Sequence, residues 1–172
     1  LITPDMLSAA PTHANYSAQG TTVLWLFAYH ERWDLIGRLE EPITATMLNA
    51  APMHADNPNQ GLTVLWLLAY RQKWDLINRL ADDGGITPDM LKAVPQHANH
   101  PEQGISVLWL LAFCRQWDMI ARFQTAGLIT PDMLKAAPQH AMNRDKGKTV
   151  LWILAYNKRW KEIDQLQSLG YI

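Results

Sequence analysis

The tripeptide Val-Leu-Trp occurs four times in this chain at a nearly constant spacing. A longer unit recurs around it, with a Met-Leu segment, a Pro-x-His-Ala segment, a glycine, and a second tryptophan eight residues after the first. A period of 41 to 43 residues is typical of solenoid proteins, in which each unit stacks on its neighbours because it cannot bury its apolar face alone. The repeat therefore predicts a single repeat domain over residues 1–172, with units 1–42, 43–85, 86–128 and 129–172. The four tripeptides end at Trp25, Trp66, Trp109 and Trp152.

Both ends of the chain lie in the same register of the repeat. Residues 1–7 are identical to residues 128–134, and residues 170–172 occupy the place that residues 127–129 hold one unit earlier. This register favours a segment cut from a longer array, or an engineered array, and a complete small protein is the alternative.

The composition excludes several classes of protein. Apolar residues make up 48% of the chain, but no stretch approaches the roughly 18 apolar residues of a membrane helix. No basic segment followed by an apolar one opens the chain, as a signal peptide would. Cys114 is the only cysteine, so an intrachain disulfide is excluded and a reducing compartment fits. We therefore expect an intracellular, cytoplasmic protein without a membrane partner.

Each unit is predicted to be helical. In the third unit, Thr87–Asp89 offers a capping threonine, a proline at the first helical position and an acid in the first turn. Pro95 ends this short helix, and a polar loop follows. Ser106 is the next N-cap, and Val107–Phe113 is apolar on all sides, as expected of a buried helix. From Trp117 onward the apolar residues resume a helical spacing until a glycine ends the unit.

Two structures fit the segment that contains both tryptophans of a unit. It is either one long helix or two helices separated by a turn near Arg115 and its equivalents. The acid directly after the second tryptophan, such as Asp75, suits the first turn of a new helix and favours the break. Both alternatives predict an all-α solenoid.

This second half of every unit resembles the ankyrin repeat. Residues 61–69 read Gly-Leu-Thr-Val-Leu-Trp-Leu-Leu-Ala, and a turn, an apolar pair and a leucine follow. The family reads Gly-x-Thr-Pro-Leu-His-x-Ala-Ala with the same continuation, so two positions of its tetrad differ here. An insertion with the Thr-Pro-Asp-Met-Leu helix takes the place of the family's finger loop. The glycine that turns the family's helix hairpin is replaced by Arg32, Gln72, Gln116 or Lys158.

The resemblance implies a divergent ankyrin-like scaffold that binds a protein partner. Ankyrin-like arrays rich in insertions are common among proteins that intracellular bacteria inject into hosts, so it also implies a bacterial effector in the host cytosol. An engineered consensus array with no natural ligand is the first alternative.

Nucleic-acid reading is a second alternative, because the layout also resembles the DNA-reading repeats of transcription-activator-like effectors. Those repeats need a cationic residue in each unit to follow the phosphates. Here the basic residues after the loop are confined to Lys146 and Lys148, and the sequence pI is ≈ 6.6. The sequence therefore disfavours nucleic acid as the partner.

One histidine recurs in each loop and invites a metal-site interpretation. Packed helices lie about 8–10 Å apart, whereas zinc ligands lie about 2 Å from the ion, so stacked equivalents cannot share one ion. We instead expect the ring nitrogens to bind the loop backbone, and we expect no metal and no cofactor. The four histidines are His13, His54, His97 and His140.

Two tryptophan columns are predicted to be core rather than an aromatic ligand groove, since they recur among apolar neighbours. We expect Trp25→Ala to destabilise the fold less than Trp66→Ala or Trp109→Ala, because the unit of Trp25 lacks a neighbour on one side. The second column comprises Trp33, Trp74, Trp117 and Trp160.

No catalytic constellation stands out in the sequence. A Gly-rich phosphate loop, an HExxH motif and a CxxC motif are all absent, and Cys114 has no counterpart in the other units. The recurring Asp34, Asp75 and Asp118 are explained by electrostatics at a helix N-terminus. We therefore expect a protein that is not an enzyme.

Variation between the units gathers in two windows, the loop and the segment after the first tryptophan. In ankyrin-like repeats the matching positions line one binding face, so the resemblance implies that a partner contacts them. Aromatic residues beside the second window could serve as interface anchors, with the inter-helix core as the alternative location. The predicted partner-binding residues are Tyr16, Gln19, Tyr29, His30, Asn59, Tyr70, Arg71, Glu102, Phe113, Cys114, Asp145, Lys148, Tyr156 and Asn157.

The formal charge is graded along the repeat. It is −3 for residues 1–42, −1 for 43–85, 0 for 86–128 and +3 for 129–172. An elongated stack would therefore carry a dipole, which could orient a charged partner or promote end-to-end self-association.

Overall fold

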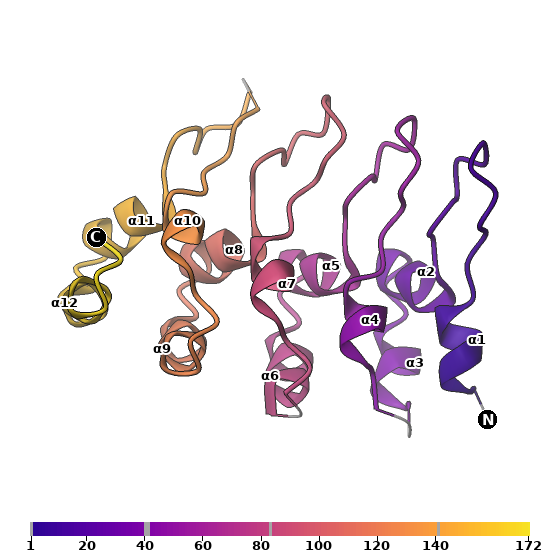
Figure 1. The fold of residues 1–172 in the computed structure, drawn as a ribbon, viewed down its shortest axis with the longest axis horizontal. Helices are drawn as coiled ribbons and strands as arrows, with labels where there is room; N and C mark the ends of the chain where they lie inside the picture. The colour runs from indigo at the N-terminus through magenta and orange to yellow at the C-terminus, as the bar shows by residue number, and fades with distance from the viewer. Residues whose placement is uncertain (1, 40–41, 83, 141) are drawn as a thin grey trace.

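The computed structural model describes residues 2–39, 42–82, 84–140 and 142–172, and in these ranges the chain is helical with no strand. Each unit contributes a short helix, an inner helix and an outer helix (Figure 1). The short helices are α1 (Pro4–Ser8), α4 (Ala45–Leu48), α7 (Pro88–Lys92) and α10 (Pro131–Leu134). The inner helices are α2 (Val23–Tyr29), α5 (Val64–Tyr70), α8 (Val107–Phe113) and α11 (Val150–Tyr156). The outer helices are α3 (Trp33–Gly37), α6 (Trp74–Asp82), α9 (Trp117–Thr125) and α12 (Trp160–Ser168).

The molecule is an elongated helical repeat array. The inner helices lie side by side in chain order, the outer helices form a second row, and long loops project from the opposite side (Figure 1). We call these loops the fingers; they connect each short helix to the next inner helix and comprise residues 9–21, 50–62, 93–105, 136–140 and 142–148. None of the helices in the described ranges has the length and apolarity to cross a membrane.

The start of every inner helix is fixed by a side-chain cap. A threonine or serine hydroxyl accepts a hydrogen bond of 3.1 Å from the backbone N–H of the first tryptophan, three residues later. Such a cap stabilises a helix by about 1 kcal/mol. The capping residues are Thr22, Thr63, Ser106 and Thr149.

The predicted break between the two tryptophans is confirmed, because a tight turn separates each inner helix from its outer helix. In the second unit the N–H of Gln72 donates to the Ala69 carbonyl and the N–H of Lys73 donates to the Leu68 carbonyl, at 3.0 and 2.9 Å. This Schellman arrangement requires a left-handed residue, which is usually glycine. Non-glycine residues occupy that position here: Glu31 (φ 58°), Gln72 (φ 56°), Arg115 (φ 60°) and Lys158 (φ 57°).

In two units the turn residue expected from the ankyrin resemblance lies one position too late in the sequence. Glu31 and Arg115 adopt the left-handed conformation, rather than Arg32 and Gln116. The turn is set by its distance from the end of the inner helix, and no glycine marks the position.

Two ladders of hydrogen bonds join neighbouring units. The indole Nε1 of Trp25, Trp66 and Trp109 donates to a backbone carbonyl of the following unit, at 2.5, 2.8 and 2.7 Å. A backbone N–H of the second, third and fourth fingers also donates to the finger before it, for example from Gln96 to the Gln60 carbonyl at 2.8 Å. The units are therefore held by directed contacts as well as by apolar packing.

The tryptophans follow the core prediction in the inner units and depart from it at the end of the array. Trp66 and Trp109 are each 2% exposed, whereas Trp152 is 43% and Trp160 is 56% exposed. Trp25 is 3% exposed, so its place in the first unit does not leave it more exposed than Trp66 or Trp109. The first tryptophan of units one to three contacts the following unit, and Trp152 belongs to the fourth unit.

Candidate binding groove

An aromatic residue ends every inner helix, four positions after the first tryptophan. Residues four apart share a helix face, and each of these rings stacks on its tryptophan with centroids 4.8–4.9 Å apart and planes within 14°. These residues are nevertheless between 39% and 70% exposed. They lie at the surface rather than in the inter-helix core. We call them the aromatic row: Tyr29, Tyr70, Phe113 and Tyr156.

The aromatic row and the fingers enclose three successive pockets. The first has a volume of about 180 Å³ and lies between Tyr29 and Tyr70, the second of about 390 Å³ lies between Tyr70 and Phe113, and the third of about 530 Å³ lies between Phe113 and Tyr156. One aromatic ring is thus shared by each adjacent pair, so the three pockets follow one another along the array, and we call them together the groove.

The groove collects most of the residues that the sequence singled out. Four predicted residues, Tyr16, Gln19, His30 and Cys114, do not line these three pockets. The predicted residues that do line them are Tyr29, Asn59, Tyr70, Arg71, Glu102, Phe113, Asp145, Lys148, Tyr156 and Asn157.

Two of the residues outside the groove have local structural contacts. The Gln19 carbonyl accepts a hydrogen bond from the Met53 N–H at 2.9 Å, and so belongs to the ladder between fingers. Cys114 caps the end of α8, where burial raises the pKa of its thiol. Tyr16 and His30 are exposed on the first finger and at the end of α2.

The centre of the groove carries a cluster of opposite charges around Tyr70. The Tyr70 hydroxyl donates to the Glu102 carboxylate at 3.3 Å, and the Arg71 guanidinium lies 5.6 Å from the centre of the Tyr70 ring. Arg71 also pairs with Glu31 of the preceding unit at 3.1 Å. Burial, followed by the charge of Glu102, raises the pKa of the Tyr70 hydroxyl. The phenol therefore stays neutral and available as a hydrogen-bond donor.

The last pocket has a similar mixture of an aromatic ring and charges. Lys148 pairs with Asp145 at 2.6 Å, and its ammonium group lies 5.3 Å from the centre of the Trp152 ring. Because cations and acids alternate beside the aromatic row, the groove offers a mixed polar rim rather than a surface of one sign.

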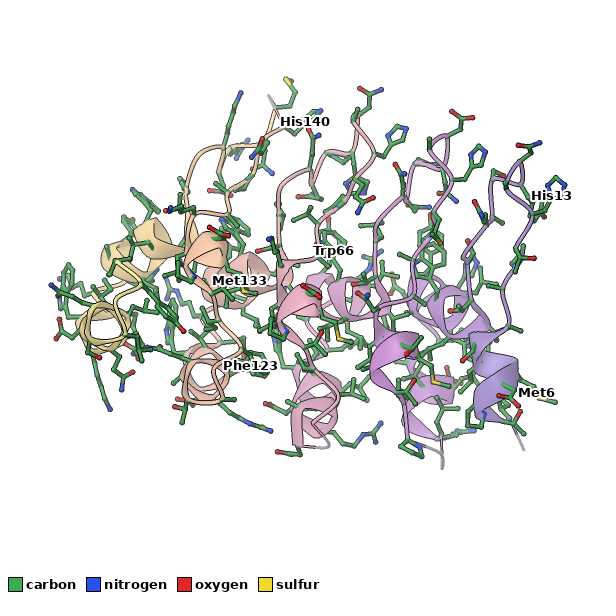
Figure 2. All side chains as sticks on the ribbon, in the orientation of Figure 1. Met6, His13, Trp66, Phe123, Met133 and His140 are labelled. Carbon is green, nitrogen blue, oxygen red and sulfur yellow. The ribbon has the colours of Figure 1, made fainter. Side chains whose placement is uncertain are left out.

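The recurring finger histidines make the backbone contacts expected of them. The Nδ1 atom of each ring accepts a hydrogen bond of 3.2–3.4 Å from the backbone N–H two residues later, which stabilises a turn in the finger. Figure 2 shows His13 and His140 far out on their fingers, away from Phe123 in the core. Among the described residues, no group of three or more histidine, cysteine or acidic side chains could hold a metal ion.

A fifth histidine, His100, belongs to the groove although the sequence analysis did not select it. Its ring lies edge-on to Trp66 with centroids 6.2 Å apart, and its Nδ1 accepts from the Glu102 N–H at 3.1 Å. Burial lowers its pKa, and His97 and His140 lower it further. His100 has no histidine counterpart in the other units, so the repeat pattern gave no signal for it.

Several other lining residues that the sequence did not predict lie in the variable finger window. These positions vary between the units. The missed residues include Pro101, Met142, Asn143 and Arg144.

Comparison with known proteins leaves the function to be argued from this geometry. No protein-family model, no curated protein sequence and no solved structure matches the chain.

Proposed function

We propose that this chain is a non-catalytic, ankyrin-like scaffold that binds an extended segment of a protein partner in the groove between the fingers and the aromatic row. The observation that carries the proposal is the aromatic row itself. Large rings that are rigidly stacked and yet open to solvent are the anchors that protein interfaces favour. Their support by buried tryptophans means that little conformational freedom is lost on binding.

The ankyrin-like part of the proposal rests on the order of elements within a unit. An inner and an outer helix joined by a tight turn, with a projecting finger before them, support the sequence resemblance. The short helix before each finger is the addition that distinguishes these units.

An extended peptide suits the groove because of its period. Packed helices lie about 8–10 Å apart, and a peptide in the extended polyproline II conformation rises about 3.1 Å per residue with three residues per turn, so every third side chain lies on the same face. A bound peptide would therefore place an apolar side chain between successive aromatic residues about every third position. The polar rim around Tyr70 and Lys148 favours a peptide with both basic and acidic residues over a polyanion such as nucleic acid.

The proposal is tested by selecting a phage-displayed random peptide library against the whole 172-residue chain. We expect enriched peptides with apolar residues at about every third position, since a polyproline II peptide with that spacing matches the groove. Phe113→Ala should weaken their binding at least about tenfold, as expected of a hot-spot aromatic. Its melting temperature, measured by circular dichroism, should change little because the Phe113 ring is half-exposed.

Leu169→Ala is the matched control, because Leu169 is equally exposed but lies outside the groove. Selected peptides that bind the Phe113 variant as tightly as the original chain would contradict the proposal. If Tyr70→Ala strongly lowers the melting temperature, the aromatic row stabilises the core rather than binding a partner.

A further inference from the structure

The groove contains a carboxylate that has no cationic partner. Glu102 is partly buried on the third finger, and the hydrogen bond that its side chain accepts within the described residues comes from the neutral Tyr70 hydroxyl, at 3.3 Å. It forms no ion pair in that part of the chain. A charge that is partly withdrawn from water without a counter-ion is destabilised, so a cation supplied by a ligand is favoured beside it.

The repeat itself shows what Glu102 lacks. The equivalent residue of the fourth finger is Asp145, which pairs at 2.6 Å with Lys148, three residues later. The residue three positions after Glu102 is Ile105, which is buried and carries no charge. In the second finger both positions are uncharged: Asn59 and Leu62. Glu102 is therefore an acid at this finger position whose counter-ion is not supplied in the same way by its own finger.

The carboxylate is held in position from two sides. The Glu102 backbone N–H donates to Nδ1 of His100 at 3.1 Å, and the His100 ring lies edge-on to the buried Trp66. The Glu102 side chain accepts from Tyr70, whose ring stacks on the same tryptophan. A ligand therefore meets a charge that is already in place, which reduces the entropy lost on binding.

Glu102 lines the second pocket of the groove together with an aromatic ring and another carboxylate. This pocket, with a volume of about 390 Å³, is lined by Glu102 and Asp145, whereas the first and third pockets each have one of these two acids. The half-exposed Phe113 lines it too, and among the described residues no cation lies over the Phe113 ring. A carboxylate beside an aromatic ring suits a guanidinium, which can form two hydrogen bonds to the acid and stack on the ring.

The chain's own arginines near this pocket do not neutralise Glu102. Arg71 pairs with Glu31 at 3.1 Å and lines the first pocket instead. Arg144 lines the second pocket, but it is exposed and makes no ion pair within the described residues. Water and salt therefore screen its charge.

We infer that Glu102 determines the specificity of the groove by binding an arginine side chain of the partner segment in the second pocket. The inference rests on the proposed peptide binding and adds which side chain this pocket takes. The methylene groups of the arginine would fill the apolar space between Tyr70 and Phe113, while its guanidinium donates to the Glu102 carboxylate. Tyr70 is then also a positioning residue, because its hydroxyl holds that carboxylate.

Peptide selection against two chains tests the inference. A phage-displayed random library is selected against the 172-residue chain and, separately, against its Glu102→Lys variant. With the original chain we expect arginine at one of the every-third positions that are otherwise apolar, and with the variant we expect aspartate or glutamate there. Peptides with only apolar residues at these positions would overturn the inference and still support the proposed groove. A library that yields no binder would overturn both.

Replacing the arginine of a selected peptide by citrulline isolates the charge, because citrulline has nearly the same shape and is neutral. In isothermal titration calorimetry this replacement should weaken binding about tenfold for the original chain and less than about twofold for Glu102→Gln. Glutamine still offers an oxygen to the Tyr70 hydroxyl, so the melting temperature of this variant should not change. Equal losses of affinity for the two chains would overturn the inference.

Tyr70→Phe provides a second measurement in case Glu102→Gln does not fold. It keeps the ring and removes the hydroxyl that holds the carboxylate, so it should weaken the arginine peptide more than the citrulline peptide. The same loss for both peptides would contradict the positioning of Glu102 by Tyr70 and, with it, the inference.

Asp56→Asn is the matched control, because Asp56 is an exposed finger carboxylate that does not line the three pockets. It should leave the difference between the arginine and citrulline peptides unchanged. Arg144→Gln should strengthen binding of the arginine peptide, since it removes a like charge from the second pocket. Weaker binding of that peptide to the Arg144 variant would mean that the pocket does not accept a cation, and would overturn the inference.

Discussion

The direction in which a tryptophan points determines how much it contributes to stability. Trp66 is buried against the following unit and donates to the Ile105 carbonyl at 2.8 Å. Trp152 has the same place in its own helix and the same N-cap, but nearly half of its surface is in water. The same residue type in the same local sequence therefore has two different environments, which only the order of the units distinguishes.

We predict that Trp66→Ala lowers the free energy of unfolding by about 3–5 kcal/mol, the usual cost of truncating a buried aromatic side chain. Trp152→Ala should lower the free energy of unfolding by less than half as much, because Trp152 buries less apolar area and makes no hydrogen bond to a following unit. Urea unfolding followed by circular dichroism measures both, at a concentration where the chain is monomeric. Equal losses for the two variants would show that the tryptophans do not face forward as described.

At the scale of the helices, the sequence predicted most of what the structure shows. The short helix, the buried inner helix and the Ser106 cap follow from the sequence, because capping and hydrophobic patterning act over a few residues. Thr87 occupies the N-cap position of α7 as predicted, but its side chain makes no capping hydrogen bond. The turn was predicted only approximately, since a left-handed residue such as Arg115 has no distinctive side chain. The placement of His100 against Trp66 is a contact between units, and no local pattern encodes it.

The left-handed turn leads to a second prediction. Gln72 has a φ of 56°, a conformation that costs a residue with a Cβ roughly 1 kcal/mol relative to glycine. Gln72→Gly should therefore stabilise the fold by up to about 1 kcal/mol, raising the melting temperature by a few degrees. Gln116→Gly is the matched control, because Gln116 has a negative φ of −80° and gains nothing from the change. A lower melting temperature for Gln72→Gly would mean that the Gln72 side chain makes contacts that outweigh the backbone strain.

At the scale of the whole molecule, the fold is set by contacts between neighbouring units. The repeat period predicted an all-α array, and the graded charge indicated that its two ends differ. The sequence did not predict which face of each unit looks forward, because the apolar residues on both faces of an inner helix are equally hydrophobic. The structure shows this direction, because Leu26 is exposed in the first unit and Trp152 is exposed in the last.

An array held by nearest-neighbour junctions should gain stability with each unit. We predict that a chain of residues 1–128 unfolds at a lower urea concentration than the whole chain, and that residues 1–85 unfold at a still lower one. Removing the last unit deletes the junction in which Trp109 donates to the Lys148 carbonyl, and Trp109 becomes exposed as Trp152 now is. Residues 43–172 provide the control, since this chain also has three units but loses the first junction instead of the last. The two three-unit chains should have similar urea midpoints, both below that of the whole chain. A urea midpoint that does not depend on the number of units would rule out stabilisation by stacking.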